Sequence, residues 1–95
     1  MLEGRVVVRL FSSVKAAFGQ PEISVPCERD SDLHSVLLRL CDTPARQGAL
    51  FLDSGLLRTE LQVLVNGRNI AFLKGLQTTL NGGDEVSIFP PMYGG

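Results

Sequence analysis

The sequence has few of the thiol and imidazole side chains that hold zinc or carry out redox chemistry. It has two cysteines, Cys27 and Cys41, and a single histidine, His34. The cysteines are far apart and form no C-x-x-C pair, so a zinc site or a dithiol motif would lack its ligands. We therefore expect no bound metal or cofactor, and we expect both thiols to be buried or half-buried.

An excess of charge of either sign and long apolar runs are also missing. Nine Lys and Arg residues against ten Asp and Glu residues leave a net charge of -1, and the charges are scattered. Nucleic acid is therefore not an expected partner. The stretch "VVVRLF" near the start is too short for a signal sequence or a membrane span. The 95 residues, of which 44% are hydrophobic, predict one cytoplasmic domain over residues 1–95 that does not bind membranes.

Alternating apolar residues predict the strands. Extended segments are expected at residues 5–11, 22–26, 61–67, 68–73 and 80–89. The second should end at Pro26, the third should run into an Asn-Gly turn, and the last should begin with a turn. Val6, Val8 and Leu10 share one face of the first strand.

Helical spacing is clearest within residues 30–41. The apolar residues at positions i, i+3, i+4 and i+7 are Leu33, Val36, Leu37 and Leu40. Asp30 or Ser31 is expected to cap this helix. Shorter helical segments are predicted at residues 12–19, closed by Gly19, and from Pro44 through residue 52. The order strand, strand, helix, strand, strand predicts an α+β fold with a mixed sheet and one main helix.

Two phenylalanines fall on the polar faces of the predicted first and last strands. If these strands are parallel neighbours, Phe11 and Phe89 lie near their carboxyl ends, beside the start of the C-terminal tail. An exposed apolar cluster with charged neighbours is typical of protein–protein contacts. The alternative is local packing, with Phe89 against Pro90 and Phe11 under the turn at residues 15–19.

The chain closes on "SIFPPMYGG", residues 87–95. Pro90 and Pro91 fix φ and remove two amide donors, so the chain should leave the sheet stiffly and end in a flexible tail over residues 90–95. The four residues that follow Pro91 span at most about 13 to 14 Å. Gly94 and Gly95 lack a Cβ atom and would pass through a narrow channel. The alternative is an ordinary frayed terminus.

The stretches "LVNGRNIAFLKGLQTTLNGGDEVSIFPPMYGG" and "VRLFSSVKAAFG" resemble the MoaD/ThiS family of ubiquitin-like sulfur carriers, especially the molybdopterin synthase small subunit. The resemblance covers the whole chain, and its most specific parts are "NGGDEVSIFPP" and the terminal Gly-Gly. It implies a β-grasp fold, with the first and last strands parallel at the sheet centre and the helix across one face. One departure is Tyr93, since small residues are more usual before the glycines.

The resemblance also implies a function. A ubiquitin-activating-type (MoeB-like) enzyme would adenylate Gly95 with ATP, sulfur would replace one oxygen to give a thiocarboxylate, and the tail would deliver it to the molybdopterin synthase large subunit (MoaE-like). Met92, Tyr93 and Gly94 would give the tail its access. The implied partner interface consists of Phe11, Leu73, Phe89, Pro90 and Pro91. The protein would be a carrier without catalytic residues of its own.

Three alternatives stay open on sequence grounds. The chain could be a protein modifier joined through Gly95 to target lysines, since the chemistry up to the adenylate is shared. It could carry sulfur for thiamine synthesis or tRNA thiolation. It could also be an interaction domain with an inert tail. Its two lysines, Lys15 and Lys74, disfavour chains of the protein on itself.

Overall fold

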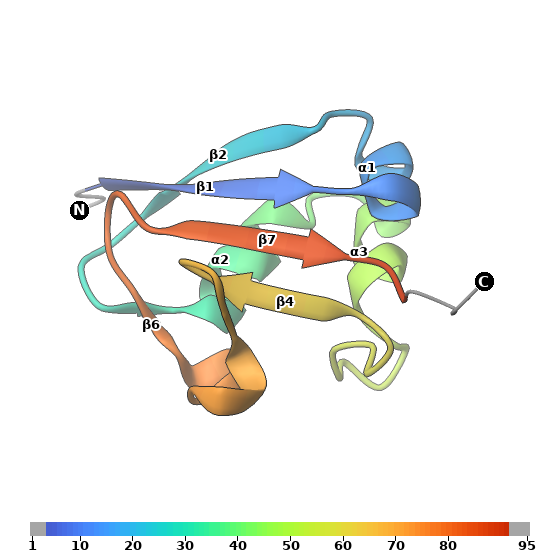
Figure 1. The fold of residues 1–95 in the computed structure, drawn as a ribbon. Coiled ribbons are helices and arrows are strands. Elements are labelled where there is room, and N and C mark those ends of the chain that lie inside the picture. The colour runs from blue at the N-terminus through green and yellow to red at the C-terminus, as the bar shows by residue number, and fades with distance from the viewer. Residues whose placement is uncertain (1–3, 92–95) are drawn as a thin grey trace.

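A five-stranded mixed sheet organises residues 4–91, the part of the chain that the computed structural model describes (Figure 1). Its strands are β1 (Gly4–Leu10), β2 (Glu22–Cys27), β4 (Gln62–Val65), β5 (Arg68–Asn69) and β7 (Glu85–Phe89). The spatial order is β2-β1-β7-β4-β5, with β1 and β7 parallel at the centre and the other neighbours antiparallel. This is the β-grasp architecture that the resemblance implied, and the α+β fold with a mixed sheet that the residue pattern predicted.

The two central strands bury one face completely, as their alternation predicts. Val8 pairs with Val86 and Leu10 with Ile88 in the parallel register. These four side chains are at most 2% exposed. Because the side-chain period of a strand is two, the same register places the alternate, more polar residues of both strands on the opposite face.

The second strand continues through its proline. Pro26 pairs with Arg5, and β2 ends one residue later, at Cys27. The prediction that Pro26 ends the strand was wrong because β2 is an edge strand of the sheet. A proline at an edge directs its missing amide away from the ladder, so pairing is not interrupted.

Three helices lie at one side of the sheet and at its end (Figure 1). They are α1 (Ser12–Phe18), α2 (Leu33–Leu40) and α3 (Pro44–Leu50). The four apolar residues predicted for the main helix are buried in α2. Gly19 ends α1 with a φ of 77°, and Pro44 occupies the first turn of α3, both as predicted. None of these helices, within residues 4–91, has both the length and the apolar character needed to cross a membrane.

The N-cap of α2 is Asp32, which corrects the expectation of Asp30 or Ser31. The carboxylate of Asp32 accepts hydrogen bonds from the Ser35 amide at 2.8 Å and from the Ser35 hydroxyl at 2.7 Å. The shift has a tertiary cause, since Ser31–Asp32 form a short strand, β3, that pairs with β6 (Thr79–Leu80). This pairing, which the sequence did not predict, keeps Asp32 extended.

We expect Asp32→Ala to lower the free energy of unfolding by about 1 kcal/mol, the usual effect of removing an N-cap. Hydrogen bonds from Ser35 lower the pKa of Asp32. A lowered folded-state pKa means that this stabilisation is present above the unfolded pKa and is lost as the pH falls through the folded pKa. Urea unfolding at neutral and acidic pH measures it, with Asp53→Ala in an exposed loop as the control. Equal free energies of unfolding for the two variants would show that Asp32 does not stabilise α2 as its N-cap.

The segment after the Asn-Gly turn is shorter as a strand than predicted. β5 stops at Asn69, and residues 70–72 form a 3-10 helix, η1 (Ile70–Phe72), followed by η2 (Gly75–Gln77). The Asn69 side chain accepts a hydrogen bond from the Ala71 amide at 2.8 Å, which starts η1 in place of a longer return strand. The helix α3 is also shorter than predicted. It ends at Leu50 and not at residue 52, because Phe51 pairs with Leu57 in an isolated bridge.

Candidate functional site at the base of the C-terminal tail

The parallel pairing of β1 and β7 places both carboxyl ends at the same end of the sheet. Phe11 follows β1 directly, and its amide donates to the Ile88 carbonyl at 3.3 Å, one step beyond the strand. Phe89 is the last residue of β7, and Pro90 and Pro91 follow it. Phe11 and the start of the tail are therefore neighbours, although they are almost eighty residues apart in the sequence.

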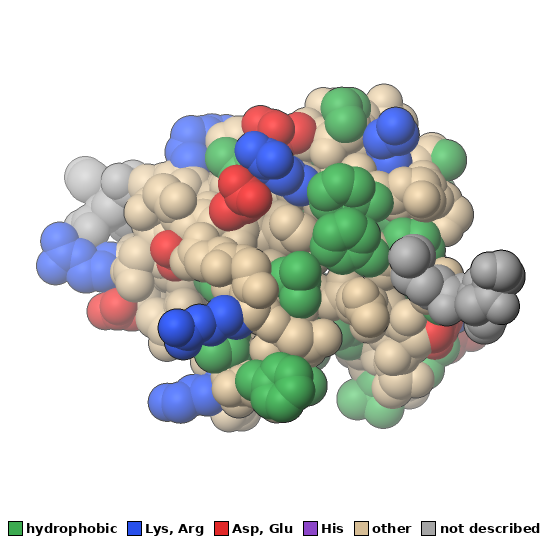
Figure 2. All heavy atoms as spheres, viewed as in Figure 1, with side chains coloured by type: hydrophobic (Ala, Val, Ile, Leu, Met, Phe, Trp, Pro, Cys, Tyr) green, Lys and Arg blue, Asp and Glu red, His purple; other side chains and the backbone are tan. Residues whose placement is uncertain are grey.

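Phe11 and Phe89 form a stacked pair on the surface. Their ring centroids are 4.2 Å apart and their planes differ by 11°. Phe11 is 36% exposed, and Phe89 is half-buried. Figure 2 shows hydrophobic side chains gathered over the carboxyl ends of β1 and β7, with charged side chains beside them. The predicted position of both rings on the polar face is confirmed, and each ring has the other as its aromatic partner.

Ser12 has an unusual backbone conformation that sequence reasoning missed. Its φ is 50°, in the left-handed region, directly after the extended Phe11. A non-glycine residue in this region costs on the order of 1 kcal/mol. The chain uses this conformation to pass from β1 into α1 without an intervening loop, which leaves Phe11 at the strand end against Phe89. No sequence pattern marks a serine for this role.

Charged residues of both signs flank the ring pair. On the same sheet face, Arg9 lies 3.4 Å from Glu85 and 4.0 Å from Glu22, and all three side chains are about half exposed. Exposed ion pairs of this kind contribute little to stability. In a protein contact, charges around an apolar centre would favour one orientation of the partner.

Leu73 belongs to another segment of the chain. It follows η1, is half-buried, and packs against the core. With Phe72 and Lys74 it lines a separate hollow. The ring pair, by contrast, stands at the carboxyl ends of the central strands. Among the predicted interface residues, the structure therefore brings Phe11 and Phe89 together and places Leu73 in a different segment.

Pro90 and Pro91 line a groove at the end of the sheet. The groove has a volume of about 330 Å³ and is formed with residues of α1, α3 and the segment 58–61. The predicted tail residues Met92, Tyr93, Gly94 and Gly95 lie outside the described residues.

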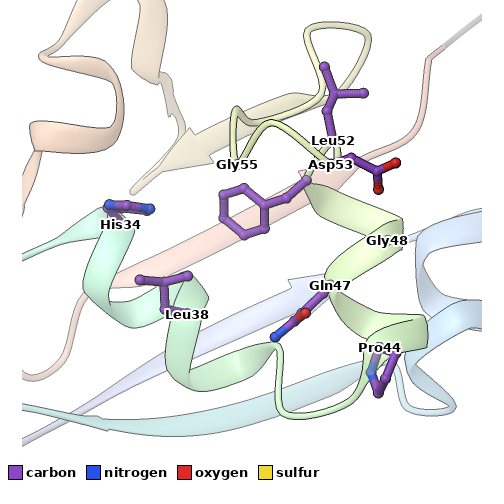
Figure 3. A pocket seen from close by; sticks show the side chains of 9 residues that line it. His34, Leu38, Pro44, Gln47, Gly48, Leu52, Asp53 and Gly55 are labelled. Atoms are coloured by element: carbon purple, nitrogen blue, oxygen red, sulfur yellow. The ribbon is translucent and has the colours of Figure 1, made fainter.

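A second groove lies between α2, α3 and the loop after α3, with a volume of about 600 Å³. Figure 3 shows His34 and Leu38 on α2 and Gln47 on α3 around it. His34 is in the first turn of α2, and its ring lies 6.0 Å from that of Phe51. Within residues 4–91, no three His, Cys, Asp or Glu side chains are grouped so that they could hold a metal ion.

Both cysteines are free and buried, which confirms the expectation for the thiols. Burial raises the pKa of Cys41 to about 11, and Arg46 opposes this rise only in part. We therefore expect Cys41 to resist iodoacetamide at pH 8, because the thiolate is the reactive form. Mass spectrometry of the alkylated protein, with and without urea, measures this. Fast modification of Cys41 in the folded protein would contradict it.

The chain is similar in sequence to a known protein family. Residues 8–95 match the model of the ThiS family. The chain belongs to the ThiS family. This ThiS-family protein is 32% identical to small archaeal modifier protein 3 of Haloferax volcanii over 88 residues. The matched region covers 93% of this chain and 96% of the relative. A putative sulfur carrier protein of Archaeoglobus fulgidus is 49% identical over 35 residues, 37% of this chain and 40% of that protein.

Solved structures support the same placement of this ThiS-family protein. The crystal structure of SAMP1 from Haloferax volcanii superposes with a TM-score of 0.85 at 30% identity, covering 97% of this chain and all of that one. The β-grasp fold and the family resemblance are therefore confirmed. None of these three relatives is named as a molybdopterin synthase subunit, so that part of the expectation stays a prediction.

Proposed function

We propose that this protein is a ubiquitin-like modifier that is activated at the carboxylate of Gly95 and joined to lysines of target proteins. One observation carries the proposal: β1 and β7 pair in parallel, so that the start of the tail and the Phe11–Phe89 pair lie at the same end of the sheet. A partner enzyme that binds the rings would thus have the tail within reach.

The chemistry of the tail requires that partner. An α-carboxylate has a reference pKa of roughly 3.3 to 3.7, so it is anionic at neutral pH and a poor electrophile. An adenylating enzyme would join the carboxylate to the α-phosphate of ATP and release pyrophosphate. A lysine amine would then attack the acyl carbon, form an amide and expel AMP. The carrier itself contributes no catalytic residue to these steps.

The relatives favour conjugation over delivery of sulfur to molybdopterin. A relative that matches over nearly the whole chain is named a modifier, and the similar crystal structure is that of SAMP1. This reverses the order expected from the sequence, where sulfur delivery came first. A second candidate, transfer of sulfur as a Gly95 thiocarboxylate, is supported by the matching segment of the putative sulfur carrier.

The two fates differ in the products found in the native host. We expect protein purified from that host to appear in larger adducts, with Gly95 in isopeptide bonds to lysines of other proteins. Peptide mass spectrometry after proteolysis identifies the linkage, and intact-mass measurement detects exchange of one oxygen for sulfur at Gly95. A tail deleted of Gly95 is the control. A sulfur-bearing form without adducts would replace the first candidate by the second.

A further inference from the structure

The groove beside Pro90 and Pro91 contains an arginine held in a fixed place. The Arg58 Nε atom donates to the Gly48 carbonyl at 2.8 Å, and the Arg58 side chain is about one third exposed. A guanidinium has five N–H donors, so this bond leaves further donors available. The charged side chains that line the groove are Arg58 and Glu60.

The ion pair in the groove is loose. Arg58 Nη1 lies 3.7 Å from the Glu60 carboxylate, longer than a hydrogen bond, and both side chains are partly exposed. Such a pair contributes little and is readily exchanged for a better-placed anion. Carboxylates bind guanidinium best through two parallel N–H donors. The groove thus offers a cation whose present partner is weakly held.

Small residues form part of the lining of the groove. Ala17 of α1 and Gly48 and Ala49 of α3 line it, where the two helices pack against each other. Side chains of this size leave room for another stretch of backbone. Glycine is the residue that lies closest against such a surface, because it has no Cβ atom.

We infer that this groove binds the chain's own residues 92–95, with the Gly95 carboxylate on Arg58. Pro91 lines the groove, and four residues reach about 13 to 14 Å from it, enough to follow a groove of which Pro91 is itself a wall. The inference rests on the proposed function in one respect, that Gly95 carries a free carboxylate. Docking would hold the tail against the domain until a partner enzyme displaces it.

Two substitutions in the groove should act in opposite directions. Arg58→Gln removes the cation and should release the tail. Glu60→Gln removes the competing carboxylate and should hold the tail more tightly. Arg58→Gln also removes the Nε donor to the Gly48 carbonyl. Glu60→Gln is nearly isosteric and leaves that bond in place, so it remains informative if loss of the arginine disturbs the fold.

The experiment uses the full-length, ¹⁵N-labelled protein without any enzyme. The ¹H–¹⁵N nuclear Overhauser effects of Gly94 and Gly95 report tail motion, and the amide shifts of Ala17 and Ala49 report the groove. We expect intermediate values for the tail in the wild type, values of a free chain end in Arg58→Gln, and more rigid values in Glu60→Gln. Added NaCl should move the groove amides only while Arg58 is present.

Three outcomes would overturn the inference. They are tail values equal in all three proteins, a groove insensitive to salt, or amide shifts that change on dilution, which would mean that the tail docks on a second copy. None depends on adenylation or conjugation. The inference would therefore fail without affecting the proposed function, and failure of the proposed function in the host would leave these measurements unchanged.

Discussion

Deleting Gly95, or adding one residue after it, is expected to abolish adenylation while leaving the fold of residues 4–91 intact. In the proposed function, the reacting carboxylate must reach ATP through a confined channel. The tail after Pro91 spans at most about 13 to 14 Å, so one residue changes the reach by roughly 3.5 Å. Near-attack geometry tolerates much less than this, and a displacement of about 1 Å costs on the order of 100-fold in rate.

ATP–pyrophosphate exchange with the cognate activating enzyme measures this effect, and thermal unfolding measures the fold in parallel. A protein with one residue added before Met1 is the matched control and should exchange like the wild type. Undiminished exchange in the protein extended after Gly95 would show that the activating enzyme does not recognise the end of the tail.

Phe89→Asp and Phe11→Asp should each weaken binding to the activating enzyme by about 2 kcal/mol or more, or roughly 30-fold in Kd. The two rings stack at 4.2 Å beside the tail and are partly exposed, so together they form an apolar anchor that a partner can cover. A carboxylate at either position would have to be desolvated on binding. Isothermal titration with the enzyme measures the loss.

Phe72→Asp is the matched control for this change. Phe72 is 87% exposed on η1, which follows the edge strand β5, two places along the sheet from β7. Its substitution should alter neither binding nor stability. Thermal unfolding shows whether the ring variants are folded. If Phe89→Asp binds as well as Phe72→Asp, the ring pair is not the contact surface. If Phe89→Asp fails to fold, the stack belongs to the core.

The central part of the fold was predictable because periodicity alone reports which face of an element is buried. Val6, Val8 and Leu10 alternate over a whole strand, and the apolar residues of α2 recur at helical spacing. The elements that the sequence did not predict at all are two or three residues long. Such elements carry too few residues for a period to appear, as β3, β6 and η1 show.

The candidate site was predictable only in part. The polar-face position of Phe11 and Phe89 followed from strand phase, whereas the 4.2 Å stack depends on register between two distant strands. The fixed position of Arg58 in the groove depends on a bond to the Gly48 carbonyl, a main-chain group that no sequence pattern identifies. Leu73 was grouped with the rings by resemblance, and its own segment places it against the core.

The sequence by itself determined the alternating strands, the main helix, the buried thiols and the composition of the tail, because each depends on residues close together in the chain. Tertiary structure decided the features that depend on contacts between residues far apart in the sequence. An added Cβ atom on Gly4 would lie 2.7 Å from the Gly82 Cα atom, so the need for glycine there arises only where the two backbones cross. The left-handed Ser12, the edge position of Pro26 and the cap at Asp32 have the same origin. Local preferences of about 1 kcal/mol were outweighed there by the packing of the whole sheet.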